Sequence, residues 1–248
     1  MARRSKSSKE NTGKEKPAGK KRNPKSKFRT MIVINFKTYE SSTGQEALKL
    51  AMACDEVAKE TDAEIIISVQ AADIFRISQH VSIPVFAQHI DPIEPGSHTG
   101  MILPQSIAQA GAEGTLLNHS ENRLRIDVLE TSIKAAKQAG LKTIVCANDA
   151  IVGQAVYSME PDLVAVEPPE LIGGNISVSN AKPEIIKSSV NKICRLGGYH
   201  KVLVGAGVKT NADIKRSIEL GARGVLLASG ITKAKNPGKI LRELVMDL

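Results

Sequence analysis

Residues 114–147 read GTLLNHSENRLRIDVLETSIKAAKQAGLKTIVCA and contain the pattern that decides the fold. Two short apolar runs, 114–118 and 142–147, enclose a longer segment, 122–140, whose apolar residues recur with helical period. The runs are apolar nearly throughout rather than at every second position, which is typical of strands buried on both faces of a parallel sheet. Gly140 closes the helical segment where a left-handed C-terminal cap is expected. The stretch therefore predicts a strand, a helix and a second, parallel strand.

The same unit recurs from Met31 to the end of the chain. Helical segments are also predicted at 45–60, 182–196 and 211–220, and Gly197 and Gly221 follow two of them as caps. Eight such units predict an α/β fold, a single (β/α)8 TIM barrel. The alternative, a doubly wound open sheet, usually has fewer strands, and no GxGxxG follows the first strand. The eight predicted strands are 31–36, 64–69, 83–88, 114–118, 142–147, 162–166, 201–205 and 224–228.

The positive charge of the chain is confined to its first residues. The formal net charge is +8, but residues 1–29 hold 12 Lys and Arg against 2 Glu, and the remainder is slightly acidic. A segment this polar cannot offset its ordering entropy, so we expect residues 1–30 to be a disordered Lys/Arg-rich tail and residues 31–248 to be the catalytic barrel domain. The tail is interpreted as a weak nucleic-acid or polyanion binder, as a solubilising extension, or as residues upstream of a true start at Met31.

No membrane segment or metal site is predicted. No apolar stretch approaches the 18 residues of a spanning helix, and the tail lacks the apolar region of a secretion signal. Cys54, Cys146 and Cys194 are widely spaced, without a CxxC pair, and are expected to pack as small hydrophobes. Free cysteines suit a reducing compartment, so we expect a cytoplasmic protein.

Catalytic groups in such barrels lie at the carboxyl ends of the strands. Glu167 follows the sixth strand, in AVEPPELIGGN (165–175), and a carboxylate shielded there would become a stronger base. Two prolines before 170–172 and two glycines after it predict a lid that moves between hinges. The alternative is a surface turn with an incidental glutamate.

His119 and Lys37 follow the fourth and first strands. We expect Ser120 to be the N-cap of the helix after His119, so that the positive end of that helix keeps the imidazole neutral. Lys37 is expected to point into the mouth, where it could neutralise a phosphate and a developing enolate. The alternatives are a structural histidine and a solvated loop lysine. His89 is a further candidate for the lining of the mouth.

Two glycine-containing loops, VGAG (204–207) and ASG (228–230), follow strands seven and eight, where barrels of this class present backbone N–H groups to phosphate. A base, a neutral hydrogen-bond donor and a cation together favour proton abstraction next to a carbonyl in a small phosphorylated substrate, without a cofactor. Metal-dependent epimerases would need paired His and Asp at several strand ends, which this sequence does not have.

From Met31 to Leu248 the chain resembles the triosephosphate isomerase family, in particular its short archaeal type. The segments that carry the resemblance, in order, are NFKTY, AQHIDP, HTGMILPQSI, GTLLNHSENR, VEPPELIGG, VGAGV and GVLLASGITKAKNP. The resemblance implies interconversion of dihydroxyacetone phosphate and D-glyceraldehyde 3-phosphate through an enediolate, in glycolysis and gluconeogenesis. It also implies a homo-oligomer, a tetramer rather than a dimer.

The resemblance assigns roles to individual residues. Glu167 corresponds to the proton acceptor, His119 to the electrophile and Lys37 to the catalytic cation, with Glu121 in a supporting role. The chain departs from the family pattern at Asn122, where Arg is usual, and after Gly173, where Gly174-Asn175-Ile176-Ser177 replaces Thr-Gly-Ile-Pro. The implied substrate-binding residues are Asn35, Phe36, Lys37, Ile172, Gly207, Ala228 and Ser229.

Two other classes of protein stay open from the residues alone. A phosphate-binding barrel with another activity, such as a lyase or a sugar-phosphate epimerase, would keep the glycine loops but not this set of Lys, His and Glu. A protein that binds RNA or a membrane surface through its tail would tolerate the loss of Glu167.

Overall fold

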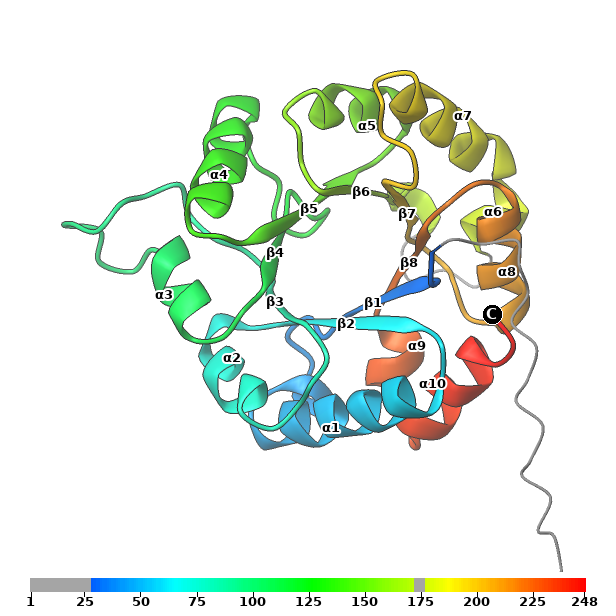
Figure 1. Ribbon diagram of the computed structural model, residues 1–248, viewed down its shortest axis with the longest axis horizontal. Helices are drawn as coiled ribbons and strands as arrows, with labels where there is room; N and C mark the ends of the chain where they lie inside the picture. The colour runs from blue at the N-terminus through cyan, green and yellow to red at the C-terminus, as the bar shows by residue number, and fades with distance from the viewer. Residues whose placement is uncertain (1–27, 172–176) are drawn as a thin grey trace, which may run out of the picture.

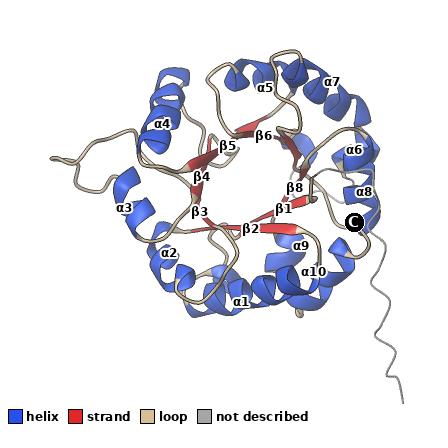
Figure 2. Ribbon diagram, in the orientation of Figure 1, coloured by secondary structure: helices blue, strands red, loops and turns tan. Residues whose placement is uncertain are grey.

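The structure, a computed structural model, describes residues 28–171 and 177–248 and has the predicted architecture. Eight parallel strands close into a barrel in the order of the sequence, and helices surround it (Figures 1 and 2). The strands are β1 Met31–Asn35, β2 Glu64–Val69, β3 Val85–Ala87, β4 Gly114–Leu117, β5 Lys142–Ala147, β6 Leu163–Val166, β7 Val202–Val204 and β8 Gly224–Leu227. The barrel prediction is confirmed. The tail prediction, except for residues 28–30, lies outside the described residues, and so do residue 172 of the predicted lid (170–172) and its glycine hinge (173–174).

The predicted strands agree closely with the observed ones. β2 and β5 have the predicted bounds, and the other strands are one or two residues shorter at one or both ends. Gly140, Gly197 and Gly221 have φ of 76°, 86° and 100°, which confirms their predicted left-handed conformation after helices.

The helices form the outer layer. α1 has the predicted bounds, but α4 begins at Ile126 rather than at residue 122. The described helices are α1 Gln45–Glu60, α2 Ala71–Ser78, α3 Pro104–Gln109, α4 Ile126–Gln138, α5 Ala150–Tyr157, α6 Val178–Ala181, α7 Pro183–Cys194, α8 Asn211–Glu219, α9 Ser229–Thr232 and α10 Pro237–Val245, with 3-10 turns η1 Glu40–Ser42 and η2 Pro169–Leu171.

Each strand contributes to two cores. Val33 of β1 packs inside the barrel with residues such as Ile66, whereas Ile32 and Ile34 pack between the sheet and the helices. Successive side chains of a strand point to opposite faces, so apolar residues are needed at every position. This explains why the sequence of each strand is apolar nearly throughout and does not alternate between apolar and polar residues.

The same alternation determines which side chains reach the mouth. The side chains of Met31 and Val33 in β1 face the inside of the barrel, and the next inward-facing position is Asn35. In the same way, the inward-facing Ala165 of β6 is followed two residues later by Glu167. Since all eight strands are parallel, their carboxyl ends lie at one end of the barrel, and these polar side chains gather there.

The last residues before β1 contact the opposite end of the barrel. The ring of Phe28 lies 4.8 Å from that of His200 and 4.9 Å from the guanidinium carbon of Arg223, measured to the ring centroids. The N–H of Glu64 donates to Thr30 O at 2.9 Å, so the chain is already attached to β2 before β1 begins. Within the described residues, no helix combines the length and hydropathy that a membrane crossing requires.

Candidate active site

The predicted residues surround a cavity at the carboxyl end of the barrel. It has a volume of about 260 Å³ and is lined by Asn35, Lys37, His119, Glu121, Glu167, Gly207, Ala228 and Ser229, together with Tyr39, Ala206, Val208, Lys209, Leu226, Leu227 and Gly230. A second cavity, of about 340 Å³, shares Lys37 and His119 with the first and extends to Gln88 and to His89, which confirms the mouth position expected for His89.

Glu167 follows β6 and is almost fully buried, with 8% of its side chain exposed. Burial raises the pKa of its carboxyl group to about 7, against the opposing effects of the Cys146 thiol, Lys37 and Arg123. Its Oε2 atom is buried without a hydrogen-bond partner in the described part of the chain. A desolvated carboxylate with an unused oxygen facing a cavity is suited to accept a proton.

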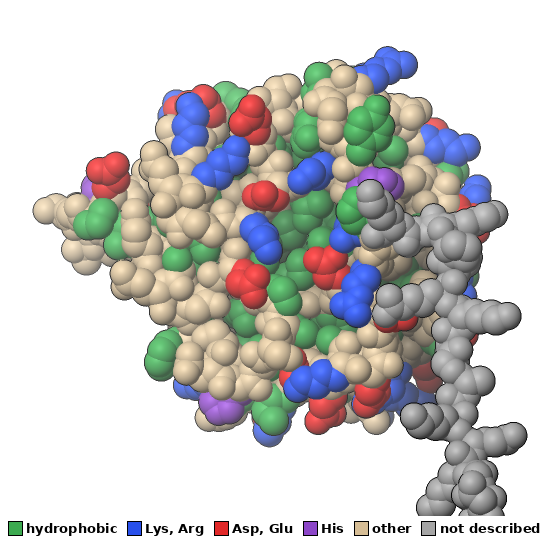
Figure 3. All heavy atoms as spheres, in the orientation of Figure 1, with side chains coloured by type: hydrophobic (Ala, Val, Ile, Leu, Met, Phe, Trp, Pro, Cys, Tyr) green, Lys and Arg blue, Asp and Glu red, His purple; other side chains and the backbone are tan. Residues whose placement is uncertain are grey.

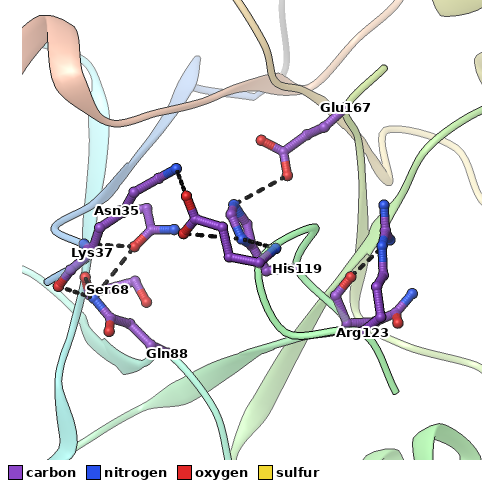
Figure 4. A network of polar contacts seen from close by, with 9 residues as sticks. Asn35, Lys37, Ser68, Gln88, His119, Arg123 and Glu167 are labelled. Carbon is purple, nitrogen blue, oxygen red and sulfur yellow. Dashed lines mark hydrogen bonds and ion pairs between the residues drawn. The ribbon is translucent and has the colours of Figure 1, made fainter. Parts of the chain in front are cut away.

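His119 faces Glu167 across the cavity (Figure 4), with Nε2 3.7 Å from Glu167 Oε2. The backbone N–H of Glu121 points at Nδ1 of His119 at 3.2 Å, so Nδ1 accepts a hydrogen bond and the proton of the neutral ring is assigned to Nε2. The imidazole therefore offers an N–H to the cavity.

The predicted neutral state of His119 is supported, but the predicted cause is wrong. Ser120 is not a helix N-cap, because residues 120–121 form a turn and α4 begins at Ile126 after Arg125. Burial, and then the positive charge of Lys37, hold the pKa of His119 below its ordinary value of 6.5, and Arg123 adds to this effect while Glu121 opposes it. Desolvation and cations, rather than a helix end, disfavour the imidazolium.

Lys37 is held in the mouth rather than in solvent. Its side chain is 11% exposed and its Nζ atom lies 2.6 Å from Glu121 Oε1. Its backbone has φ of 51°, and Gln88 Nε2 donates to its carbonyl oxygen at 2.9 Å (Figure 4). The Lys37 N–H also donates to Asn35 Oδ1 at 2.9 Å. These contacts support the predicted position of Lys37 in the mouth and place Asn35 and Glu121 next to it.

Phe36 differs from the prediction. Its side chain is fully buried in the core between sheet and helices and does not line the cavity. Asn35 and Lys37 on either side of it point into the mouth, so strand alternation turns Phe36 outward. Its side chain is therefore not a substrate contact in this structure.

The loops after β7 and β8 form the far wall of the cavity. Ala206 and Gly207 both have left-handed backbones, with φ of 72° and 71°. Ala228 and Ser229 precede and begin the short helix α9. Ile172, which was predicted to contact substrate, lies outside the described residues. Backbone groups in this place are suited to a phosphate, as the sequence predicted.

The structure describes Ser177 and Asn122 among the departures from the family pattern, and residues 174–176 lie outside the described part of the chain. Ser177 has φ of −72°, which proline also adopts, and its hydroxyl donates to Asp213 Oδ1 at 2.6 Å. Asp213 also accepts from the backbone N–H groups of Lys209 and Thr210, so Ser177 is tied to the loop after β7. Asn122 lines the second cavity, and its N–H donates to His119 O at 2.9 Å.

Several residues that border the site were not predicted as site residues. Tyr39, Val208 and Lys209 line the cavity from loops, where strand alternation predicts nothing. Gly205 was noted only as part of a phosphate loop, yet it lies against the side chain of Glu167. In the described residues, no three His, Cys, Asp or Glu side chains are grouped as metal ligands would be.

The chain is similar to known triosephosphate isomerases. A sequence model of the triosephosphate isomerase family matches residues 30–244. The chain is 49% identical to the triosephosphate isomerase of Methanobacterium bryantii over 218 residues, which are 88% of this chain and 96% of that protein. It is 46% identical to that of Methanobrevibacter smithii over 218 residues, 88% of this chain and 98% of the relative.

A solved structure shows the same fold. The crystal structure of triosephosphate isomerase from Bartonella henselae matches with a TM-score of 0.70 at 20% identity, over 86% of this chain and 98% of that chain. At this identity the structural likeness supports the barrel alone.

Proposed function

The chain belongs to the triosephosphate isomerase family, and we propose that Glu167, His119 and Lys37 perform the chemistry of this family at the mouth of the barrel. The protein is an intramolecular oxidoreductase that interconverts dihydroxyacetone phosphate and D-glyceraldehyde 3-phosphate, a step of glycolysis and gluconeogenesis. The observation that carries the assignment is the buried Oε2 of Glu167, which has no hydrogen-bond partner among the described residues and lies opposite the N–H of His119.

Glu167 begins the reaction as a base. It takes a proton from C1 of dihydroxyacetone phosphate, and the electron pair of that C–H bond forms the C1–C2 double bond while O2 becomes negative. A carboxylate with a pKa of about 7 is a stronger base than an exposed glutamate and is still ionised in about half of the molecules at neutral pH. Burial supplies this basicity, because it disfavours the charge that proton transfer removes.

His119 and Lys37 stabilise the charge that develops. The N–H of His119 donates to the enediolate oxygens, and the imidazole passes the O1 proton to O2. Lys37 places a positive charge beside the same oxygens, and Glu121 holds its ammonium group. Glu167 then returns its proton to C2, which completes the aldehyde at C1 and the hydroxyl at C2.

The substrate-binding residues in the proposal are Asn35, Gly207, Ala228 and Ser229. Asn35 accepts from the Lys37 N–H and so fixes the first strand end. Gly207 and the Ala228–Ser229 backbone bind the phosphate on the opposite wall, which keeps the reacting carbons between His119 and Glu167. Ile172 is included on the resemblance alone.

A coupled assay of the purified protein with D-glyceraldehyde 3-phosphate tests the activity, and Glu167→Gln and His119→Gln test the assigned roles. Each variant should lose isomerisation and the exchange of the C1 proton with deuterated water. Wild-type exchange in Glu167→Gln would remove this residue from the chemistry.

We also propose that the protein is a homotetramer in the cytoplasm. Ile126 and Ile151, at the starts of α4 and α5, are 62% and 72% exposed, and Ile126 borders a cavity between the two helices; exposed apolar side chains of this size favour association. The three cysteines are free, which suits a reducing compartment. Light scattering of the eluted protein tests the tetramer, and fractionation of the source cells tests the location.

A further inference from the structure

His119 faces the cavity although strand alternation would turn it away. Leu116 of β4 packs inside the barrel and Leu117 packs outside it, so a continued strand would point residue 119 outward. Asn118 interrupts the alternation, because its backbone has φ of 58°. As a result, Asn118 lines the cavity between α4 and α5, and His119 lines the mouth.

Three hydrogen bonds hold Asn118 in this conformation. Its side-chain Nδ2 donates to Cys146 O at 2.9 Å, and its Oδ1 accepts from the Leu124 N–H at 3.0 Å. Its own carbonyl oxygen accepts from Arg123 Nη1 at 3.0 Å. Asparagine is among the few residues other than glycine that adopt a left-handed backbone readily.

One of these bonds connects the Asn118 side chain, next to His119, to β5, which is the neighbour of the strand that Glu167 follows. Cys146 is on β5, and the next residue on that strand, Ala147, accepts the Glu167 N–H at 2.8 Å. The path from His119 through the Asn118 side chain to β5 and on to Glu167 therefore consists of short, buried polar contacts. It spans the two groups between which the substrate reacts.

We propose that Asn118 is a positioning residue for the isomerisation: its side chain turns His119 into the mouth and fixes it relative to Glu167. This inference rests on the proposed roles of those two residues. Asn118 itself does not line the mouth, so it acts only through His119.

Asn118→Gly is the main test, because glycine keeps the left-handed backbone and removes both side-chain hydrogen bonds. If the imidazole is displaced by a fraction of an ångström, kcat should fall by about 10- to 100-fold. KM for D-glyceraldehyde 3-phosphate and inhibition by inorganic phosphate should change less than about twofold, since the phosphate loops are untouched. Inhibition by 2-phosphoglycolate, whose carboxylate resembles the enediolate oxygens, should weaken in parallel with kcat.

Asn211→Gly is the matched control. The Asn211 side chain also donates to backbone carbonyls, those of Leu244 and Met246, both at 2.8 Å, but it does not line the cavity. This variant should lower the melting temperature without changing kcat. If Asn118→Gly behaves in the same way, with a lower melting temperature and wild-type kcat, Asn118 is only structural and the proposal is wrong.

A double mutant separates this inference from the proposed function. In a His119→Gln background, Asn118→Gly should cost little further kcat, since the group that it positions is already absent. An equal loss in both backgrounds would show that Asn118 does not act through His119. Wild-type kcat in His119→Gln alone would instead overturn the role of His119. If Asn118→Gly does not fold, Asn118→Asp replaces it: aspartate tolerates the same backbone but places an oxygen opposite Cys146 O, and wild-type kcat in that variant would contradict the proposal.

Discussion

Gly205 lies directly against the side chain of Glu167, and there is no room for a Cβ atom between them. A Cβ built on Gly205 would lie 2.3 Å from Glu167 Cγ and 2.4 Å from its Oε1. Such distances are far inside van der Waals contact, so the glycine at the end of β7 defines the position of the base at the end of β6. The two strands are neighbours in the barrel, and the Gly205 N–H donates to Val166 O at 3.0 Å.

Gly205→Ala should therefore displace the carboxylate. We expect kcat to fall by roughly 10- to 100-fold, because a small misplacement of a catalytic group is enough for such a loss. Gly153→Ala, in the middle of α5, is the control: its Cβ would be 3.7 Å from the nearest side chain, and alanine should stabilise the helix by about 0.5–1 kcal/mol. Equal kcat for the two variants would show that the contact does not position Glu167.

Glu167→Asp tests the position of the base from the other side. Shortening the side chain withdraws the carboxylate by about one bond, and the turnover number should fall on the order of 10²-fold. The melting temperature should stay near that of the wild type, since the charge is kept. An unchanged turnover number would exclude Glu167 from proton transfer.

The raised pKa of Glu167 predicts how stability depends on pH. The folded-state pKa of about 7 lies above the ordinary value of 4.5, so the folded state binds the proton more tightly than the unfolded state. Below about pH 4.5 both states are protonated, and the difference in pKa does not lower the stability. Between about pH 4.5 and 7 the stability of the wild type should decrease, by roughly 3 kcal/mol in total, and the effect should level off above pH 7.

Glu167→Gln isolates this effect, because glutamine does not titrate and all other groups are shared. The free energy of unfolding of the variant minus that of the wild type should rise from pH 4.5 to 7 and then remain constant. It is measured by urea unfolding at a series of pH values. A difference that is flat across this range, or that decreases with pH, would contradict the raised pKa.

Two deletions of different length test whether residues 28–30, just before β1, stabilise the barrel. Deletion of residues 1–27 should leave kcat and the melting temperature unchanged, since so polar a segment contributes little packing. Deletion of residues 1–30 also removes the contacts of the Phe28 ring with Arg223 and His200. It further removes the hydrogen bond that the Glu64 N–H donates to Thr30 O. We expect that second deletion to lower the free energy of unfolding by about 1 kcal/mol or more. Equal melting temperatures for the two proteins would show that residues 28–30 are not anchored.

Deletion of residues 1–27 also tests whether the tail binds polyanions. Figure 3 shows basic and acidic side chains interspersed on one face of the barrel, so that face offers no extended region of one sign. The full-length protein should be retained on a heparin column and eluted by moderate salt, whereas the protein without residues 1–27 should flow through. Retention of the shortened protein would assign the binding to the barrel instead.

The sequence by itself determined the barrel, since every strand needed an apolar residue on both faces and every predicted strand was found. It also determined that Asn35 and Glu167 reach the mouth, because each continues the inward-facing positions of its strand. These inferences depend only on the two-residue period of a strand and on the shared direction of parallel strands. Lys37 reaches the mouth as predicted, but it lies beyond the end of β1 and has a left-handed backbone, so the period alone does not explain its position. The same period predicts that the Phe36 side chain is buried. Its assignment as a substrate-binding residue came from the resemblance to a family.

The tertiary structure determined the features of the site that the two-residue period of a strand does not predict. His119 enters the mouth because the left-handed backbone of Asn118 breaks the alternation, and three contacts with residues on β5 and in the loop before α4 maintain that backbone. The neutral imidazole was expected from a helix end, but that helix begins seven residues after His119, at Ile126; burial and the charges of Lys37 and Arg123 lower the pKa of the imidazole instead. Hydrogen bonds, desolvation and charge act between groups that are close in space, and only the folded barrel brings residues 37, 119 and 167 together.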